Sequence, residues 1–275
     1  MSALEIVEAM NSEDKNVAET VRLALPEIAD AVNLIADRLF QGGRLLYVGA
    51  GTSGRLGVMD ASECPPTFGV SPELIQGLIA GGVSALTDEI EGAEDDSIAG
   101  ESVMKNTGVN RKDVVLGLSA SGTTPFVLAA MEYTKQQGSA RIGLACEMDS
   151  VLLKNVDVAI CVPVGPEILY GSTRLKAGTA QKMILNMLST AVMVKLGKVY
   201  KNHMVDLRVS NIKLVRRAEV MVAELGEVSQ ETATKLLKET GNNVKTAIVM
   251  AKRKINILEA EKNLKAVDGI LSKII

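Results

Sequence analysis

Residues 44–55 read RLLYVGAGTSGR, and this stretch decides the fold. Its apolar first half predicts a buried strand. Three glycines with two hydroxyl side chains among them follow, and this pattern predicts a tight turn that opens a helix. Glycine lets backbone N–H groups approach a ligand closely, and a helix N-terminus carries a partial positive charge. The stretch therefore predicts an anion site, most often one for phosphate. Its candidate ligands are Gly51, Thr52, Ser53 and Arg55.

A dinucleotide site is the first alternative, because Gly49, Gly51 and Gly54 match the pattern G-x-G-x-x-G. Such a site also needs an acidic residue at the end of the second strand, roughly 20 residues further on. The next apolar run, residues 74–79, is followed by Ala-Gly-Gly and has no carboxylate at that end. The sequence therefore favours a smaller phosphorylated ligand. A tight turn that binds nothing is the remaining alternative.

The composition excludes several classes of partner. The chain has 275 residues, of which 47% are hydrophobic, no tryptophan and a formal charge of −3. It therefore has neither the positive charge nor the aromatic platforms with which proteins bind nucleic acids. The longest apolar helical run, residues 183–194, is too short to span a bilayer and predicts a buried core helix. We expect no nucleic-acid partner and no membrane partner.

The N-terminus and the cysteines indicate the compartment. Residues 1–8 contain no basic segment and no long apolar run, so we expect no signal peptide. The three cysteines, Cys64, Cys146 and Cys161, are odd in number and widely spaced, which fits neither a disulfide framework nor a zinc site. We expect free thiols in a cytoplasmic protein.

Helical and extended patterns alternate along the first part of the chain. Helical periodicity covers residues 14–41, with a break near Pro26. After the first strand, we expect strands at 74–79, 114–118, 141–145 and 156–162, and helices at 83–105 and 125–137. This alternation predicts an α/β fold, a three-layer sandwich whose central parallel sheet is covered by helices on both faces. Ligands of such sheets bind at the carboxyl ends of the strands.

The last hundred residues have a different character, because no strand pattern returns after residue 176. Helices are expected at 205–225, at 229–239 with Ser229 as the cap, at 244–254 and at 257–275. We therefore expect two domains. Residues 1–222 form a domain that binds the phosphorylated ligand and carries the N-terminal helices, and residues 223–275 form a small helical subdomain.

A second hydroxyl-rich loop follows the strand expected at 114–118. It contains Ser119, Ser121, Thr123 and Thr124 around Gly122, and Pro125 then opens a helix. Four hydroxyls at a helix N-terminus suit the oxygens of a phosphate group. The alternative is ordinary helix capping, since serine and threonine perform that role routinely. Two such loops at two strand ends favour the ligand site.

A third polar stretch, residues 165–179, precedes the core helix. Its candidate ligands are Glu167, Ser172, Thr173 and Lys176. A surface loop followed by a capped helix is the alternative interpretation.

Carboxylates are the candidates for acid–base chemistry. Glu63 stands just before Pro65 and Pro66, which restrict the backbone, and Glu94 lies in an acidic run that is typical of a solvated helix face. His203 is the only histidine, so a metal site that needs two histidines is excluded and none is expected. The residues by themselves single out neither carboxylate.

Taken together, the motifs resemble those of N-acetylmuramic acid 6-phosphate etherases, a family of the sugar isomerase (SIS) superfamily. The resemblance covers essentially the whole chain. It is strongest at residues 49–57, 60–67, 91–95, 165–179 and 186–190. The pattern at 165–179 is also shared with glucokinase regulatory proteins, which carry two SIS domains, whereas this chain has room for one.

The resemblance implies an activity and a site. It implies cleavage of the D-lactyl ether of N-acetylmuramic acid 6-phosphate in cell-wall sugar recycling, by a homodimer without metal or organic cofactor. It matches Glu63 to the catalytic acid and Glu94 to the second acid/base. Glu63 would have to stay protonated near neutral pH, and burial of its side chain would favour the protonated form. The alternatives are a non-catalytic sugar-phosphate sensor and an aldose–ketose isomerase.

The chain departs from the family pattern in two places. Thr123 stands where the second loop usually has arginine, and the chain starts almost at the stretch matched by residues 4–7, which a further segment usually precedes.

Overall fold

The computed structural model describes residues 1–209 and 211–275. Its contacts divide the chain into two compact units. The first unit comprises Met1–Ser62 and Pro72–Thr190, and the second comprises Glu63–Ser71 and Ala191–Ile275. None of the described helices is long and apolar enough to cross a membrane.

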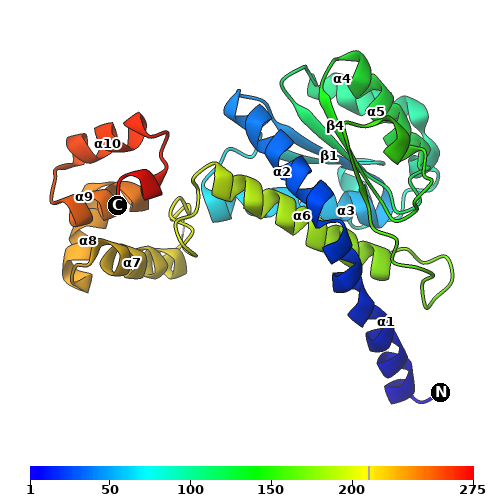
Figure 1. Ribbon diagram of the computed structural model, residues 1–275, viewed down its shortest axis with the longest axis horizontal. Coiled ribbons are helices and arrows are strands. Elements are labelled where there is room, and N and C mark those ends of the chain that lie inside the picture. The colour runs from blue at the N-terminus through cyan, green and yellow to red at the C-terminus, as the bar shows by residue number, and fades with distance from the viewer. Residues whose placement is uncertain (210) are drawn as a thin grey trace. The chain divides into compact units, whose positions relative to one another are not determined.

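The first unit is built on the parallel sheet that contains β1 and β4 in Figure 1. Its five strands are in the order β2-β1-β3-β4-β5. The strands are β1 (Leu45–Gly49), β2 (Ile75–Ile79), β3 (Val114–Leu118), β4 (Ala140–Ala145) and β5 (Val158–Cys161). Every residue of β1 and β3 is buried, as expected for central strands covered on both faces. The predicted parallel α/β sheet is confirmed.

Helices cover both faces of this sheet. They are α2 (Leu25–Phe40), α3 (Gly51–Phe68), α4 (Ser97–Thr107), α5 (Pro125–Gln136) and α6 (Lys176–Lys195). The first helix, α1 (Ala3–Leu23), precedes them and has Val17 and Val21 as its buried residues. On one face, Leu46 and Val48 of β1 pack with Phe126 of α5 and with α4. Tyr47 points to the other face, where its hydroxyl meets Asp60 of α3. The three-layer arrangement is therefore confirmed.

One helix prediction in the first unit is wrong, and another is confirmed in part. The single helix expected at 83–105 is two short 3-10 turns, η1 (Val83–Leu86) and η2 (Ala93–Asp95), followed by α4. Gly82 and Gly92 have positive φ angles, which break a right-handed helix, and Asp96 caps α4 anew. The helical region expected at 14–41 begins earlier, at Ala3, whereas the break expected near Pro26 is confirmed at Ala24, two residues before the proline.

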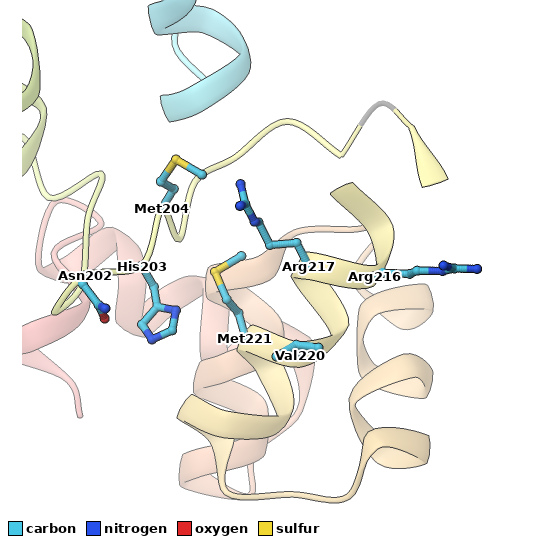
Figure 2. A pocket seen from close by; sticks show the side chains of 7 residues that line it. All are labelled: Asn202, His203, Met204, Arg216, Arg217, Val220 and Met221. Atoms are coloured by element: carbon cyan, nitrogen blue, oxygen red, sulfur yellow. The ribbon is translucent and has the colours of Figure 1, made fainter. Parts of the chain in front are cut away.

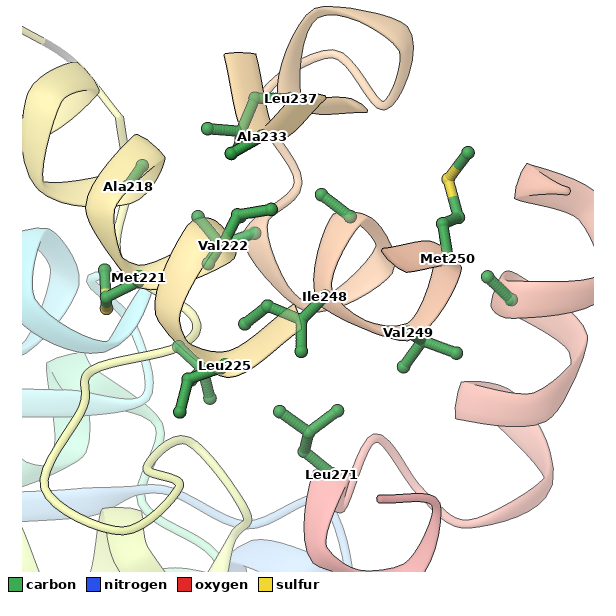
Figure 3. Packing of buried hydrophobic residues seen from close by; sticks show 14 of the residues in the cluster. Ala218, Met221, Val222, Leu225, Ala233, Leu237, Ile248, Val249, Met250 and Leu271 are labelled. Atoms are coloured by element: carbon green, nitrogen blue, oxygen red, sulfur yellow. The ribbon is translucent and has the colours of Figure 1, made fainter. Parts of the chain in front are cut away.

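The second unit is helical, and its core is shown in Figure 3. Its helices are α7 (Ile212–Gly226), α8 (Gln230–Glu239), α9 (Val244–Arg253) and α10 (Ile257–Ala266), followed by a short turn, η4 (Leu271–Lys273). Val222 and Leu225 of α7 lie beside Ile248 of α9 in this core. The predicted cap at Ser229 is confirmed.

Three expected boundaries fall elsewhere in the second unit. The helix expected from residue 205 starts at Ile212, with Asn211 as its cap, and the helix expected at 257–275 ends at Ala266. The expected domain boundary between 222 and 223 falls inside α7. All of α7 packs with the helices that follow it, and the contacts divide the chain after Thr190 instead.

Candidate functional site

A first cleft lies where β1 and β2 end. It measures about 530 Å³, which suits a small ligand. Gly51, Thr52, Arg55 and Glu94 all line it, so four of the predicted site residues come together here. Ser53 is buried and does not line this cleft.

The three glycines of the turn have different roles. A Cβ at Gly54 would lie 2.6 Å from the side chain of Ile79 and 2.7 Å from the carbonyl oxygen of Gly49. Gly49 and Gly54 therefore let α3 start directly against the strands. Gly51 has a φ of +50° and open space around it. Gly51 is thus the glycine of this turn that faces the cleft.

Arg55 shapes the acidic wall of the first cleft. Its guanidinium donates to the carbonyl oxygens of Leu86 (3.2 Å) and Asp88 (3.0 Å). These bonds hold the segment that runs from η1 into η2, whose exposed carboxylates line the cleft. They are Asp88, Glu89, Glu91 and Glu94. A wall of four carboxylates favours proton transfer over binding of an anion.

The second hydroxyl loop begins beside the glycine turn that follows β1, because Gly49 of β1 pairs with Leu118 of β3. Its hydroxyls bond one another: Ser119 Oγ lies 2.8 Å from Thr124 Oγ1, and Ser121 Oγ lies 3.0 Å from Thr123 Oγ1. Ser119 Oγ also accepts from the N–H of Gly122 at 2.9 Å. Thr124 precedes α5 without capping it through its side chain. The helix-capping alternative is therefore wrong for Thr124.

A second cleft of about 300 Å³ joins this loop to the third polar stretch. Ser121 lines it from one side, and Glu167 and Thr173 line it from the other. Cys146 also lines it, and burial, followed by the nearby Cys161, raises the pKa of the Cys146 thiol to about 12. The thiol is therefore protonated at neutral pH and is a poor nucleophile.

Glu167 and Lys176 are engaged by the protein itself. Both carboxylate oxygens of Glu167 accept backbone N–H groups at the start of α6, from Lys176 and Ala177, each at 3.0 Å. The ammonium of Lys176 is buried and lies 2.6 Å from the carboxylate of Glu13 on α1. The capped helix expected as the alternative is present. Ser172 is half-buried and does not line the second cleft.

Glu63 lies on α3, which continues through Pro65 and Pro66 to Phe68. Its side chain is exposed in the structure, so it does not have the burial that would favour its protonated form. Glu63 does not line either of the two clefts.

Asp60, which was not among the residues expected in the site, lies one turn before Glu63 and is buried. Its Oδ2 accepts from the hydroxyl of Tyr47 (3.0 Å), and its Oδ1 accepts from Asn186 Nδ2 (2.7 Å) and Ser189 Oγ (3.1 Å). One signal was visible in the sequence, because Asn186 and Ser189 are spaced to share a face of an otherwise apolar helix.

A third cleft, of about 540 Å³, belongs to the second unit (Figure 2). Its lining residues are Asn202, His203, Met204, Arg216, Arg217, Val220 and Met221. The imidazole of His203 lies 3.5 Å from the carboxylate of Glu224. No predicted ligand from the sequence lies in this cleft, and the described residues contain no cluster that could hold a metal ion.

Comparison with known proteins shows which family this chain belongs to. Residues 27–135 match the model of the glucokinase regulatory protein N-terminal SIS domain, 94–191 that of the SIS domain, and 201–240 that of the C-terminal lid domain of glucokinase regulatory protein. The N-acetylmuramic acid 6-phosphate etherase of Clostridium beijerinckii is 49% identical over 273 residues, which are 99% of this chain and 90% of that protein. The chain belongs to the N-acetylmuramic acid 6-phosphate etherase family.

Other members of this etherase family match equally well. The protein of that name from Serratia proteamaculans is 52% identical over 271 residues, which are 98% of this chain and 91% of the relative. Solved structures support the fold of these etherases at much lower identity. A phosphoheptose isomerase from Francisella tularensis covers 70% of this chain and all of its own, at 20% identity and a TM-score of 0.55. The phosphoheptose isomerase from Neisseria gonorrhoeae covers 70% and 98%, at 19% identity and a TM-score of 0.51.

Proposed function

We propose that this chain cleaves the D-lactyl ether of N-acetylmuramic acid 6-phosphate and releases N-acetylglucosamine 6-phosphate and D-lactate. The observation that carries this proposal is the first cleft, where Glu94 faces the glycine turn at the start of α3. The family supports it, since relatives about 50% identical over nearly the whole chain bear the etherase name.

The reaction needs two proton-transfer groups and no redox step. In the open-chain sugar, the aldehyde acidifies the proton on C2, and a carboxylate removes it. The C3–O bond then breaks, and the lactate leaves with the ether oxygen and with a proton from a carboxylic acid. Water adds its hydroxyl to C3 of the unsaturated aldehyde, and C2 regains a proton. We assign these transfers to Glu63, as the acid, and Glu94, as the second acid/base.

We propose that the 6-phosphate binds at the second hydroxyl loop rather than beside Glu94. The four carboxylates of the first cleft repel an anion, whereas the second loop offers hydroxyls at the N-terminus of α5. Ser119, Ser121, Thr123 and Thr124 are the candidate ligands there. Because β1 and β3 are neighbouring strands about 4.8 Å apart, a bound sugar can extend from one loop toward the other.

Lactate release tests the proposed activity directly. The pure protein is incubated with N-acetylmuramic acid 6-phosphate, and D-lactate is assayed with Glu63→Gln and Glu94→Gln as matched variants. We expect lactate from the unmodified protein, and a loss of at least about 100-fold in each variant, with binding of N-acetylglucosamine 6-phosphate retained. Failure of the unmodified protein to release lactate would contradict the proposal.

A sugar-phosphate sensor is the second candidate, favoured by the matches of residues 27–135 and 201–240 to domains of glucokinase regulatory protein. Calorimetry separates the two, since a sensor would bind the intact ether tightly without turnover. A ketose phosphate product would instead indicate an isomerase.

We further propose that the chain acts as a cytoplasmic homodimer. The first half of α1 presents exposed apolar side chains, including Leu4 (64% exposed) and Val7 (56%), while the buried residues of α1 are Val17 and Val21. Figure 1 shows α1 extending beyond the sheet of its own unit. Light scattering after gel filtration should give twice the 29.1 kDa of one chain, and Leu4→Glu with Val7→Glu should shift it toward one chain. A monomeric unmodified protein would contradict this proposal.

A further inference from the structure

The buried carboxylate of Asp60 takes no part in the proposed proton transfers. Asp60 is 3% exposed and receives three side-chain donors, from Tyr47 on β1 and from Asn186 and Ser189 on α6. A buried carboxylate is costly unless its oxygens are satisfied, so these donors fix both its place and its orientation. The network joins β1, α3 and α6 at a single point of α3.

The first half of α3 does not depend on this network. A Cβ at Gly54 would lie 2.6 Å from Ile79, and a Cβ at Gly57 would lie 3.0 Å from Tyr47. A Cβ at Gly77 of β2 would lie 2.5 Å from the backbone of Val58. These close approaches hold the helix against β1 and β2 as far as Val58.

The second half of α3 is held differently. Pro65 and Pro66 have no N–H groups, so they cannot donate to the carbonyls of Ala61 and Ser62, as residues of an unbroken helix would. The turn that carries Glu63 therefore lacks two backbone hydrogen bonds of a regular helix. Asp60 lies three residues before Glu63 and anchors the helix just before this weakened turn.

We propose that Asp60 is a positioning residue, which through its bonds to Tyr47, Asn186 and Ser189 sets the direction in which α3 presents Glu63. This inference rests on the proposed etherase activity, in which Glu63 is the acid. A misplacement of about 1 Å of a proton donor can cost roughly 100-fold in rate. The phosphate ligands lie on another loop, so substrate binding does not depend on the network.

The test compares two isosteric changes of buried carboxylates. In Asp60→Asn, an amide N–H₂ group replaces one carboxylate oxygen. A donor then faces a side-chain donor that needs an acceptor. Asp113→Asn makes the same change just before β3, outside the two clefts, where Asp113 is 1% exposed and its Oδ2 accepts from Arg44 Nη2 at 2.7 Å. Both variants should lower the melting temperature. Only Asp60→Asn should lower kcat, by about 10- to 100-fold, with KM for N-acetylmuramic acid 6-phosphate changed less than about twofold.

Two further variants keep the test decisive if Asp60→Asn folds poorly. Tyr47→Phe removes one donor without changing the fold and should lower kcat by a few fold with KM unchanged. Adding Asn186→Asp to Asp60→Asn reverses donor and acceptor and should restore most of the lost kcat.

The outcomes separate the inference from the proposed function. An unmodified protein that releases no lactate overturns the etherase assignment. If the unmodified protein is active and Asp60→Asn keeps its kcat, the positioning role is overturned. It is also overturned if Asp60→Asn loses activity only in proportion to the loss of folded protein, as is expected of Asp113→Asn. A rise in KM at constant kcat would overturn it as well.

Discussion

The glycines at the start of α3 have separate roles that single substitutions can distinguish. Gly54→Ala would place a methyl group 2.6 Å from the Ile79 side chain, and we expect it to lower the free energy of unfolding by about 1–3 kcal/mol. Gly51→Ala meets no atom within 4 Å, but the φ of +50° strains any side chain there, so it should cost about 1 kcal/mol of stability. Because Gly51 also faces the first cleft, Gly51→Ala should raise KM, which Gly54→Ala should not. Urea unfolding and steady-state kinetics measure both effects. A Gly54→Ala protein as stable as the unmodified one would contradict the close packing described here.

Ser150 lies buried against Gly122 of the second hydroxyl loop. Its Oγ is buried without a hydrogen-bond partner among the described atoms, and a Cβ at Gly122 would lie 2.4 Å from it. Ser150→Ala removes an unsatisfied polar group, so we expect stability to stay unchanged or to rise by up to about 1 kcal/mol. Thermal unfolding measures this, and a clear loss of stability would show that the hydroxyl has a partner.

At the scale of elements, α6 depends on a cap that lies nine residues before it. Glu167 accepts two backbone N–H groups at the helix start, so Glu167→Ala should cost about 1–2 kcal/mol of stability. Ser172→Ala, in the same stretch, is the matched control and should cost much less. Urea unfolding of the two variants is the measurement, and equal losses would mean that Glu167 has no special role in capping.

The second unit contains a buried lysine that predicts a dependence of stability on pH. Burial lowers the pKa of Lys245 on α9 from 10.5, although the Asp206 carboxylate 2.6 Å away raises it. Between the folded-state pKa and 10.5, the unfolded chain binds more protons than the folded chain, so the free energy of unfolding rises with pH. Lys245→Met should remove this rise.

Lys245→Met should also leave stability at neutral pH unchanged or higher. Asp206 keeps a second partner, Lys198, at 3.0 Å, so its charge stays compensated. Urea unfolding between pH 7 and pH 10 tests both expectations. A fall in the stability of the unmodified protein across that window would contradict the assignment.

The elements show how far the sequence predicts the structure. Strand β3 was predicted with its observed bounds, and β1 was predicted in the apolar half of residues 44–55, because apolar runs that end in turns rich in glycine and hydroxyl residues are distinctive. The helix expected at 83–105 was wrong, since Gly82 and Gly92 break it and leave the acidic segment as a wall of the first cleft. The carboxylates of this segment therefore line a cleft, whereas those of a solvated helix face would point into open solvent.

At the scale of the molecule, sequence patterns identified the hydroxyl loops and the family but not the partners of each side chain. Glu167 and Lys176 were expected to bind a ligand, yet one caps α6 and the other pairs with Glu13, 163 residues away. Asp60 was missed because its donors come from β1 and α6, and contacts over such separations leave almost no local pattern.

The most direct test of elimination and water addition is the fate of solvent atoms. The reaction is run in H₂¹⁸O and, separately, in D₂O, and both products are analysed by mass spectrometry. We predict one ¹⁸O and one deuterium in N-acetylglucosamine 6-phosphate, at C3 and C2, and neither label in D-lactate. An ¹⁸O atom in the lactate, or a sugar without deuterium at C2, would contradict the proposed chemistry.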